Sequence, residues 1–226
     1  MKKISVIIPV LNSERYLEYT LKSIIKQNYN NFEIIIIDGG SEDNTINIIQ
    51  KYDKYITYFE SGKDRNMYDA INKGLRLVKG DIWTVLNSDD FYINNNLFNI
   101  VNEKFENNED IDGVSFNLIC VDENNEIIKV KKRLKINYKN LLNFGHCTFM
   151  SQPGTFLSKE IIYNIGYFDV NYNDNNLHVK FTTSSESNTD KFIIQSSIDA
   201  DIFEDICDLK AAVYSSFDRY YDRKLI

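Results

Sequence analysis

Short apolar runs that alternate with helical patterns constrain the fold of this chain more than any other feature of its sequence. The predicted strands are 4–8, 32–37, 56–59 and 82–86. Runs that are apolar at successive positions are typical of parallel strands that helices cover on both faces. The intervening segments carry apolar residues at helical spacing, most clearly over 67–78, and Gly80 is expected to cap that helix. We therefore predict an α/β fold with a mostly parallel sheet flanked by helices.

The second half of the chain predicts a smaller region of different character. Residues 113–121 and 126–132 have the pattern of a hairpin, and 171–188 show no usable periodicity, so that we expect a mobile loop there. Helices are predicted near 138–142, at 158–165 and at 202–214. A chain of 226 residues is long enough for one substantial core. We expect a single domain made of two halves, 1–110 and 111–226.

Charge and composition exclude several classes of function. The formal net charge of -7 leaves no surplus of cations to follow a phosphate backbone, so nucleic acid is not an expected partner. No apolar run approaches the roughly 20 residues that cross a bilayer, and the N-terminus lacks the pattern of a signal peptide. We therefore expect no transmembrane segment and a cytoplasmic location. Two histidines leave little material for a histidine-ligated zinc or a catalytic triad.

Loops follow three of the predicted strands, at 9–12, 38–43 and 87–90. The carboxyl ends of parallel strands meet at one edge of the sheet, so we expect these loops to converge there. Asp89 and Asp90 place two carboxylates together, and a divalent cation would relieve their repulsion. A polar turn with a helix cap explains the same pair equally well.

Asp38 follows the second strand, where Rossmann dehydrogenases hold a ribose. The first turn, 9–14, contains no glycine, so a pyrophosphate could not approach its backbone as it does in those enzymes. Asp38 could still accept hydrogen bonds from a base or ribose. Considered alone, it is more simply explained as a turn-forming residue before Gly39, with Ser41 and Asp43 capping the next helix.

Taken together, the order and spacing of these segments resemble the family 2 glycosyltransferases with the GT-A fold, particularly bacterial enzymes that build surface polysaccharides. The resemblance covers about the first 172 residues. The matching segments are 5–12 (SVIIPVLN), 37–45 (IDGGSEDNT), 64–74 (DRNMYDAINKG), 80–82 (GDI), 86–90 (LNSDD), 152–156 (QPGTF) and 166–169 (GYFD).

This resemblance implies an enzyme that transfers a sugar, with inversion, from a nucleotide-diphospho-sugar to a glycan or lipid-linked glycan acceptor. A UDP-sugar is the favoured donor, and Mn²⁺ or Mg²⁺ the expected cofactor. It implies a donor-binding half at 1–110 and an acceptor-side half at 111–226. Asp89 matches the last residue of the family's D-x-D metal motif, while Asp90 is assigned to catalysis and Asp38 to the base. The implied donor-binding residues are Pro9, Asn12, Glu14, Asp38, Gly39, Asp69, Lys73, Ser88 and Asp89.

Inversion by direct displacement also requires a carboxylate that takes the proton of the acceptor hydroxyl. Family members carry this base shortly after a Phe-Asp-Glu stretch, whereas here Asp169 is followed by an irregular segment. The best later match assigns the base to Asp201, followed by Asp199, Glu204 and Asp169 as alternatives. A helix N-cap is the simpler explanation for Asp201. His146 and Gln152 match in part a His-Gln pair that relatives keep beside the acceptor cleft.

Two other functions remain open at the level of sequence. The altered segment after Asp169 is compatible with a non-catalytic nucleotide-sugar binding module whose acceptor region is degenerate. A nucleotidyltransferase of related fold is the weaker alternative, because those enzymes carry a glycine-rich basic loop after the first strand. Five basic residues in 129–135 would allow peripheral contact with an anionic membrane, although a solvated hairpin edge explains them as well.

Overall fold

The computed structural model describes residues 1–108, 111–122, 126–131, 152–168, 178–181 and 192–195. These residues belong to two compact units. The first comprises 1–116 and 152–167, so it takes in strands from beyond the expected division at residue 110. Within the described parts of the chain, no helix has the length and apolar character needed to cross a membrane.

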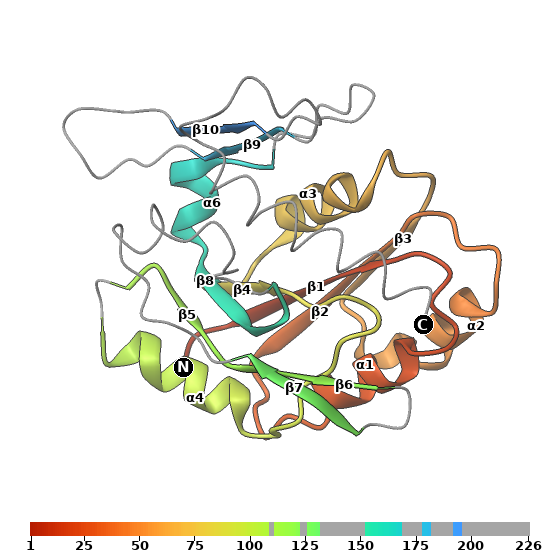
Figure 1. The fold of residues 1–226 in the computed structure, drawn as a ribbon, viewed down its shortest axis with the longest axis horizontal. Coiled ribbons are helices and arrows are strands. Elements are labelled where there is room, and N and C mark those ends of the chain that lie inside the picture. Colours follow the sequence, from red (N-terminus) through yellow and green to blue (C-terminus); the bar gives the residue numbers. More distant parts are fainter. Residues whose placement is uncertain (109–110, 123–125, 132–151, 169–177, 182–191, 196–226) are drawn as a thin grey trace. The chain divides into compact units, whose positions relative to one another are not determined.

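The first unit is built on a six-stranded sheet whose strand order is β3-β2-β1-β4-β8-β5 (Figure 1). Strands β3, β2, β1 and β4 run parallel, and β8 pairs antiparallel with both β4 and β5. The bounds are β1 Ile4–Val10, β2 Phe32–Asp38, β3 Tyr58–Ser61, β4 Ile82–Val85, β5 Gly113–Ser115 and β8 Thr155–Ser158. The prediction of a mostly parallel α/β sheet is confirmed.

Helices connect the parallel strands β1 to β4, as the sequence pattern predicts. They are α1 Leu17–Ile25, α2 Thr45–Lys51 and α3 Met67–Leu77, with the short 3-10 turn η1 Asp53–Tyr55 before β3. Helix α4 Leu97–Glu106 lies between β4 and β5, the 3-10 turn η2 Gln152–Gly154 precedes β8, and helix α6 Glu160–Ile165 follows β8. Asn66 is the N-cap of α3, because its side chain accepts hydrogen bonds from the amides of Tyr68 and Asp69. This cap fixes where the first turn of α3 begins.

The core lies on both faces of β1 and β2, because every residue of β1 and all but the first of β2 are buried. Leu17, Leu21 and Ile24 of α1 pack into it from one side. Phe98 of α4 contacts Phe156 of β8 edge to face, with ring centroids 6.1 Å apart. This aromatic contact packs α4 against β8.

Two small antiparallel sheets belong to the second unit. Strands β6 Leu118–Val121 and β7 Ile127–Lys131 form a hairpin, in which the amide of Asp122 donates to the carbonyl of Glu126. Strands β9 His178–Phe181 and β10 Phe192–Gln195 pair with each other.

Several predictions about individual elements were wrong. Gly80 does not cap α3, whose C-cap is Val78; a side chain at position 80 would lie 2.6 Å from the carbonyl oxygen of Lys3, so glycine is needed for close approach to β1. The run 113–121 divides into two strands that join different sheets. Residues 178–181, expected to be loop, form β9.

Three further elements were not predicted, namely α4, β8 and β10. The helices predicted near 138–142 and at 202–214 lie outside the described residues.

Candidate functional site

The loops after β1 and β2 are bonded directly to each other at the carboxyl end of the sheet. The amide of Gly39 donates to the carbonyl of Val10 over 2.8 Å. The amide of Asn12 donates to Oγ of Ser41, and the side-chain oxygen of Asn12 accepts from the amide of Glu42 at 2.9 Å. Asn12 holds a left-handed conformation, with φ of 47°, which asparagine tolerates better than most residues. Asn12 therefore links the two loops.

Residues 13 and 14 continue this contact to the start of α2. The amide of Ser13 donates to Oγ1 of Thr45 at 2.7 Å, and the amide of Glu14 donates to Asp43 at 3.1 Å. The carboxylate of Glu14 accepts in return from the amide of Asn44. Glu14, a predicted donor-binding residue, thus helps to hold the loop together. Pro9, another of them, is buried in β1 beside Ile37.

The loop after β4, which contains residues 87–90, is bonded to α1 and to the first loop. The hydroxyls of Ser13 and Ser88 lie 2.6 Å apart. The buried Oγ1 of Thr20 lies 2.9 Å from the carbonyl oxygen of Ser88 and 2.8 Å from that of Asp90. A single hydroxyl proton is shared between these two carbonyls. The expectation that three loops converge at this edge is confirmed.

Asp89 and Asp90 differ in their surroundings. Asp89 is exposed at the end of this loop, whereas Asp90 is half-buried and accepts a hydrogen bond from the side chain of Asn87 at 3.1 Å. Among the described residues, no three acidic, histidine or cysteine side chains cluster closely enough to hold a metal by themselves. Mg²⁺ commonly takes one or two carboxylates together with substrate phosphates. The residues present therefore fit a cation shared between Asp89 and a diphosphate, but not a closed protein cage.

Asp38 is fully buried, and its carboxylate accepts hydrogen bonds from its own turn. Its donors are the amides of Gly40 and Ser41 and the hydroxyls of Ser41 and Ser61. These bonds use the acceptor capacity of a carboxylate. In the structure Asp38 shapes the turn after β2 and joins that turn to β3, and its contact with a base stays a prediction.

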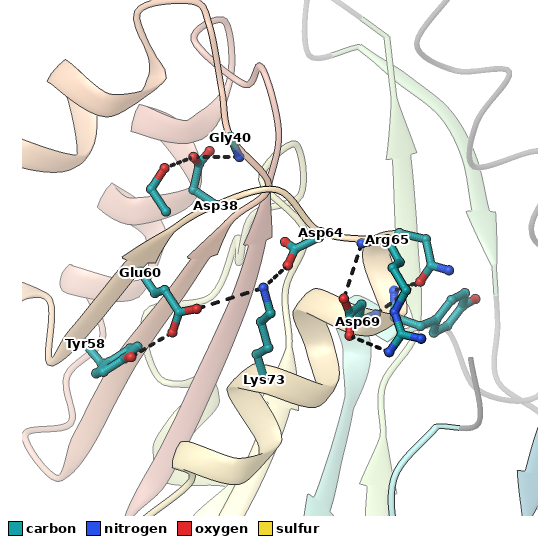
Figure 2. Close-up of polar contacts among 11 residues, drawn as sticks. Asp38, Gly40, Tyr58, Glu60, Asp64, Arg65, Asp69 and Lys73 are labelled. Carbon is teal, nitrogen blue, oxygen red and sulfur yellow. Dashed lines mark hydrogen bonds and ion pairs between the residues drawn. The ribbon is translucent and has the colours of Figure 1, made fainter. Parts of the chain in front are cut away.

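Lys73 lies on the inner side of α3 between two carboxylates (Figure 2). Its ammonium group forms an ion pair with Oδ1 of Asp64 and lies 3.9 Å from Glu60. Asp64 raises the pKa of Lys73, while burial raises the pKa of Asp64 even though Lys73 opposes that shift. Lys73, predicted to contact a diphosphate, is thus held by acidic partners in this structure.

Asp69 lies in the first turn of α3 and interacts with Arg65 (Figure 2). Its carboxylate accepts from the amide of Arg65 at 3.2 Å and lies 3.5 Å from the guanidinium group. Burial alone would raise the pKa of Asp69, but the two contacts with Arg65 outweigh it and lower the pKa. Asp69 is therefore ionised at neutral pH and fixed in orientation.

The acceptor-side predictions fall largely outside the described residues. The structure does not describe five of these residues, namely Asp201, Asp199, Glu204, Asp169 and His146. The backbone of Gln152 begins η2, immediately before β8.

Sequence reasoning missed Asp64, which was quoted only as part of a motif. Its side chain is 6 % exposed, and Oδ2 has no hydrogen-bond partner in the described structure. In the sequence, Asp64 is recognisable only as a residue of the loop before the helix that carries Lys73. Its contact with Lys73 could not be predicted, because it spans nine residues and depends on the path of that loop.

The sheet order and the three cross-bonded loops define an α/β protein with a GT-A-like fold. The structure resembles that of Staphylococcus aureus TarS 1-349 in complex with UDP-GlcNAc, with a TM-score of 0.59, 20% identity, and coverage of 74% of this chain and 48% of that one. The sequence model of Glycosyl transferase family 2 matches residues 5–166. The chain therefore belongs to glycosyltransferase family 2.

Relatives of this chain are longer than the chain itself. An uncharacterized glycosyltransferase of Haemophilus influenzae is 35% identical over 154 residues, which are 67% of this chain and 61% of that protein. The poly(ribitol-phosphate) beta-N-acetylglucosaminyltransferase TarP of Staphylococcus aureus is 35% identical over 116 residues, 49% of this chain and 36% of TarP. A mannosyltransferase of Pyrobaculum calidifontis, solved with GDP-Man and Mn²⁺, shares the fold with a TM-score of 0.56, 16% identity, and coverage of 74% of this chain and 48% of that one.

Proposed function

We propose that this chain binds a UDP-sugar together with Mn²⁺ or Mg²⁺ and transfers the sugar, with inversion, to a glycan or lipid-linked glycan. One observation carries the proposal. Asp89 is an exposed carboxylate in the loop after β4, which is bonded to the first loop and to α1 at the carboxyl end of the sheet, where ligands of α/β sheets bind.

The family and the fold neighbours support three parts of the proposal: the transfer of a sugar, the nucleotide-sugar donor and the divalent cation. Membership of glycosyltransferase family 2 supports sugar transfer. The TarS complex contains UDP-GlcNAc, and the Pyrobaculum mannosyltransferase complex contains GDP-Man and Mn²⁺. A divalent cation at Asp89 would offset the negative charge that develops on the departing nucleoside diphosphate. Thr20 and Ser13 would act by keeping the loop of Asp89 in one conformation.

The roles of the remaining predicted residues follow from their positions. Asn12 and Glu14 maintain the loop against which the nucleotide would lie, and the amide of Gly39 is bonded to that loop through the carbonyl of Val10. Lys73 is the cation nearest to a diphosphate in this scheme, and it would exchange Glu60 for a phosphate oxygen while keeping Asp64. Asp201 remains the proposed base for the acceptor hydroxyl.

Calorimetry with UDP in the presence and absence of Mn²⁺ tests the donor half. We expect UDP to bind only in the presence of the metal. In Asp89→Ala the affinity for UDP with Mn²⁺ should fall at least about tenfold, because one ligand to the cation is removed. Glu103→Ala is the control, because Glu103 is an exposed carboxylate on α4. Metal-independent binding that Asp89→Ala leaves unchanged would refute the assignment of the metal.

Release of UDP from a panel of UDP-sugars, with and without glycan acceptors, separates an enzyme from a binding module. We expect slow release by hydrolysis alone and faster release with the matching acceptor. UDP binding without turnover of any donor would favour the non-catalytic module. In Asp201→Asn, transfer is expected to be lost while UDP affinity is retained.

A further inference from the structure

Phe91 is an exposed aromatic side chain that follows the carboxylates of the candidate site. It is 37% exposed, whereas the next residue, Tyr92, is buried. One residue separates Phe91 from Asp89, so their Cα atoms lie at most about 7.6 Å apart. A single exposed apolar side chain is common on protein surfaces and needs no explanation by itself. The case for a role of Phe91 therefore depends on how its backbone is held and on where it lies.

The backbone on both sides of Phe91 is bonded to α1. Oγ1 of Thr20 lies 2.8 Å from the carbonyl oxygen of Asp90, and the amide of Tyr92 donates to Oγ of Ser23 at 3.1 Å. Both peptide groups that adjoin Phe91 are therefore fixed, and its ring is carried by a rigid backbone. A contact surface held in this way loses little conformational entropy when a ligand covers it.

The segment that carries Phe91 leads from β4 toward β8. The buried ring of Tyr92 stacks on Phe156 of β8, with ring centroids 5.9 Å apart. In the sheet, β8 lies on one side of β4, and β1 and β2 lie on the other (Figure 1). In the proposed function the nucleotide lies against the loops after β1 and β2. The chain therefore runs from Asp89 through Phe91 away from the nucleotide.

The motif that resembles the acceptor side of family members lies at the same end of β4. Strand β8 runs antiparallel to β4, and Phe156 near its start pairs with Thr84 near the end of β4. The 3-10 turn η2 begins with Gln152, precedes β8 and contacts β4, so it lies beside the carboxyl end of that strand. Gln152 belongs to the partial match with the His-Gln pair of the acceptor cleft. Phe91 thus lies on the side where the acceptor is expected.

We propose that Phe91 is a platform on which a pyranose ring of the acceptor glycan stacks. This inference rests on the proposed function, because it assumes that a donor sugar is held beside Asp89. The face of a pyranose ring carries C–H groups whose small positive charge suits the negative face of an aromatic ring. Stacking on Phe91 would hold the acceptor hydroxyl beside the donor sugar, and such positioning speeds a reaction between two substrates.

The charges next to Phe91 favour a neutral cyclic acceptor over an anionic polymer. The segment 87–96 contains two carboxylates, Asp89 and Asp90, and no lysine or arginine. The proposed cation adds no surplus of positive charge, because the diphosphate of the donor offsets it. An acyclic polyol phosphate would bring negative charge close to these carboxylates, and it has no ring to cover Phe91. The residue that accepts the sugar is therefore a pyranose.

Three variants separate stacking from simple apolar contact. The assay follows release of UDP from the UDP-sugar with a glycan acceptor of the wild type, and it gives kcat and the KM for that acceptor. Phe91→Leu keeps an apolar side chain but loses the flat ring, so the KM should rise about tenfold. Phe91→Tyr keeps the ring and should retain the KM of the wild type. Ile93→Ala is the matched control, because Ile93 is 69% exposed in the same segment and its removal should leave the KM unchanged.

A second readout tests whether Phe91 only supports the loop of Asp89. In Phe91→Leu the dissociation constant of UDP with Mn²⁺ and the rate of donor hydrolysis without acceptor should equal those of the wild type. A purely structural role would weaken both of them together with the KM. An unchanged KM in Phe91→Leu, or a loss of UDP affinity as large as the rise in KM, would overturn the proposal.

A panel of acceptors distinguishes failure of this inference from failure of the proposed function. The panel contains methyl pyranosides, oligosaccharides, lipid-linked oligosaccharides and poly(ribitol phosphate). We expect transfer to a pyranose, with the effect of Phe91→Leu present in soluble acceptors too. Transfer to poly(ribitol phosphate) alone, or an effect of Phe91→Leu confined to lipid-linked acceptors, would refute stacking while leaving sugar transfer intact. A wild type that transfers sugar to no member of the panel would refute the proposed function together with this inference.

Discussion

Replacing Gly74 with alanine tests how closely α3 packs against the sheet. Gly74 lies on α3, one residue after Lys73, and faces β1. A Cβ atom at this position would lie 2.4 Å from Cγ2 of Ile7, a distance that carbon atoms do not reach without displacement. Ile7 is fully buried, so it has little room to move away. The substitution therefore forces α3 outward from the sheet.

The net effect is the difference between two opposing contributions. Overpacking a core costs about 1–3 kcal/mol, and the severity of this contact favours the upper end. Alanine is better than glycine in a helix by about 1 kcal/mol, which offsets part of that cost. We expect a net loss of about 2 kcal/mol in the free energy of unfolding. For a domain of this size that loss lowers Tm by about 4–8 °C.

Thermal unfolding followed by circular dichroism measures this change, and Gly62→Ala is the control. Gly62 has no atom within 4 Å of an added Cβ, so its substitution should leave Tm unchanged or slightly higher. UDP affinity should fall in Gly74→Ala, because Asp69 and Lys73 move with α3. An unchanged or raised Tm in Gly74→Ala would refute the close packing of α3 on β1.

Two further substitutions test individual carboxylates. Asp38→Asn places an amide among four hydrogen-bond donors and should cost about 1–3 kcal/mol, measured by urea unfolding. Unchanged stability with weaker UDP binding would instead support the predicted contact of Asp38 with the base. Glu18 is hydrogen-bonded by Lys51, Tyr52 and Lys22, which lower its pKa from 4.5 to about 2. Folding lowers the pKa of Glu18, so the wild type should be more stable than Glu18→Gln at neutral pH. This difference in the free energy of unfolding should disappear as the pH falls from 4.5 to about 2. A constant difference over that range would contradict the hydrogen bonds assigned to Glu18.

The central strands could be predicted because each contains a run of successive apolar residues, such as 6–10 and 34–37, a pattern that requires burial on both faces. Helix α4 was overlooked because it follows a run of asparagines, although Phe98, Val101 and Phe105 form a buried stripe at helical spacing. Strand β8 has only four residues and pairs antiparallel with β4. Its place in the sheet depends on a distant partner and not on a local pattern.

The convergence of the three loops followed from topology, because parallel strands end at one edge. The roles of single carboxylates did not follow. Asp38 is bonded to Ser61, which reaches it through the pairing of β2 with β3, and Asp64 meets Lys73 through the course of the loop before α3. A motif in the sequence identifies where polar groups gather. The hydrogen-bond partners of each carboxylate depend on contacts across the sheet, and these partners determine which carboxylate oxygen can still accept a bond.

The hydrogen bonds among the loops also bear on how strongly a nucleotide can bind. Ordering a loop when a ligand binds makes the free energy of binding less favourable, by about 0.5–1.5 kcal/mol for each side chain that becomes fixed. Here Asn12, Ser13 and Ser88 are already fixed by one another and by the second loop. Asp89 lies in this fixed loop. The proposed donor site is therefore largely preorganised, and substitutions in the network behind it should weaken UDP binding without touching the nucleotide.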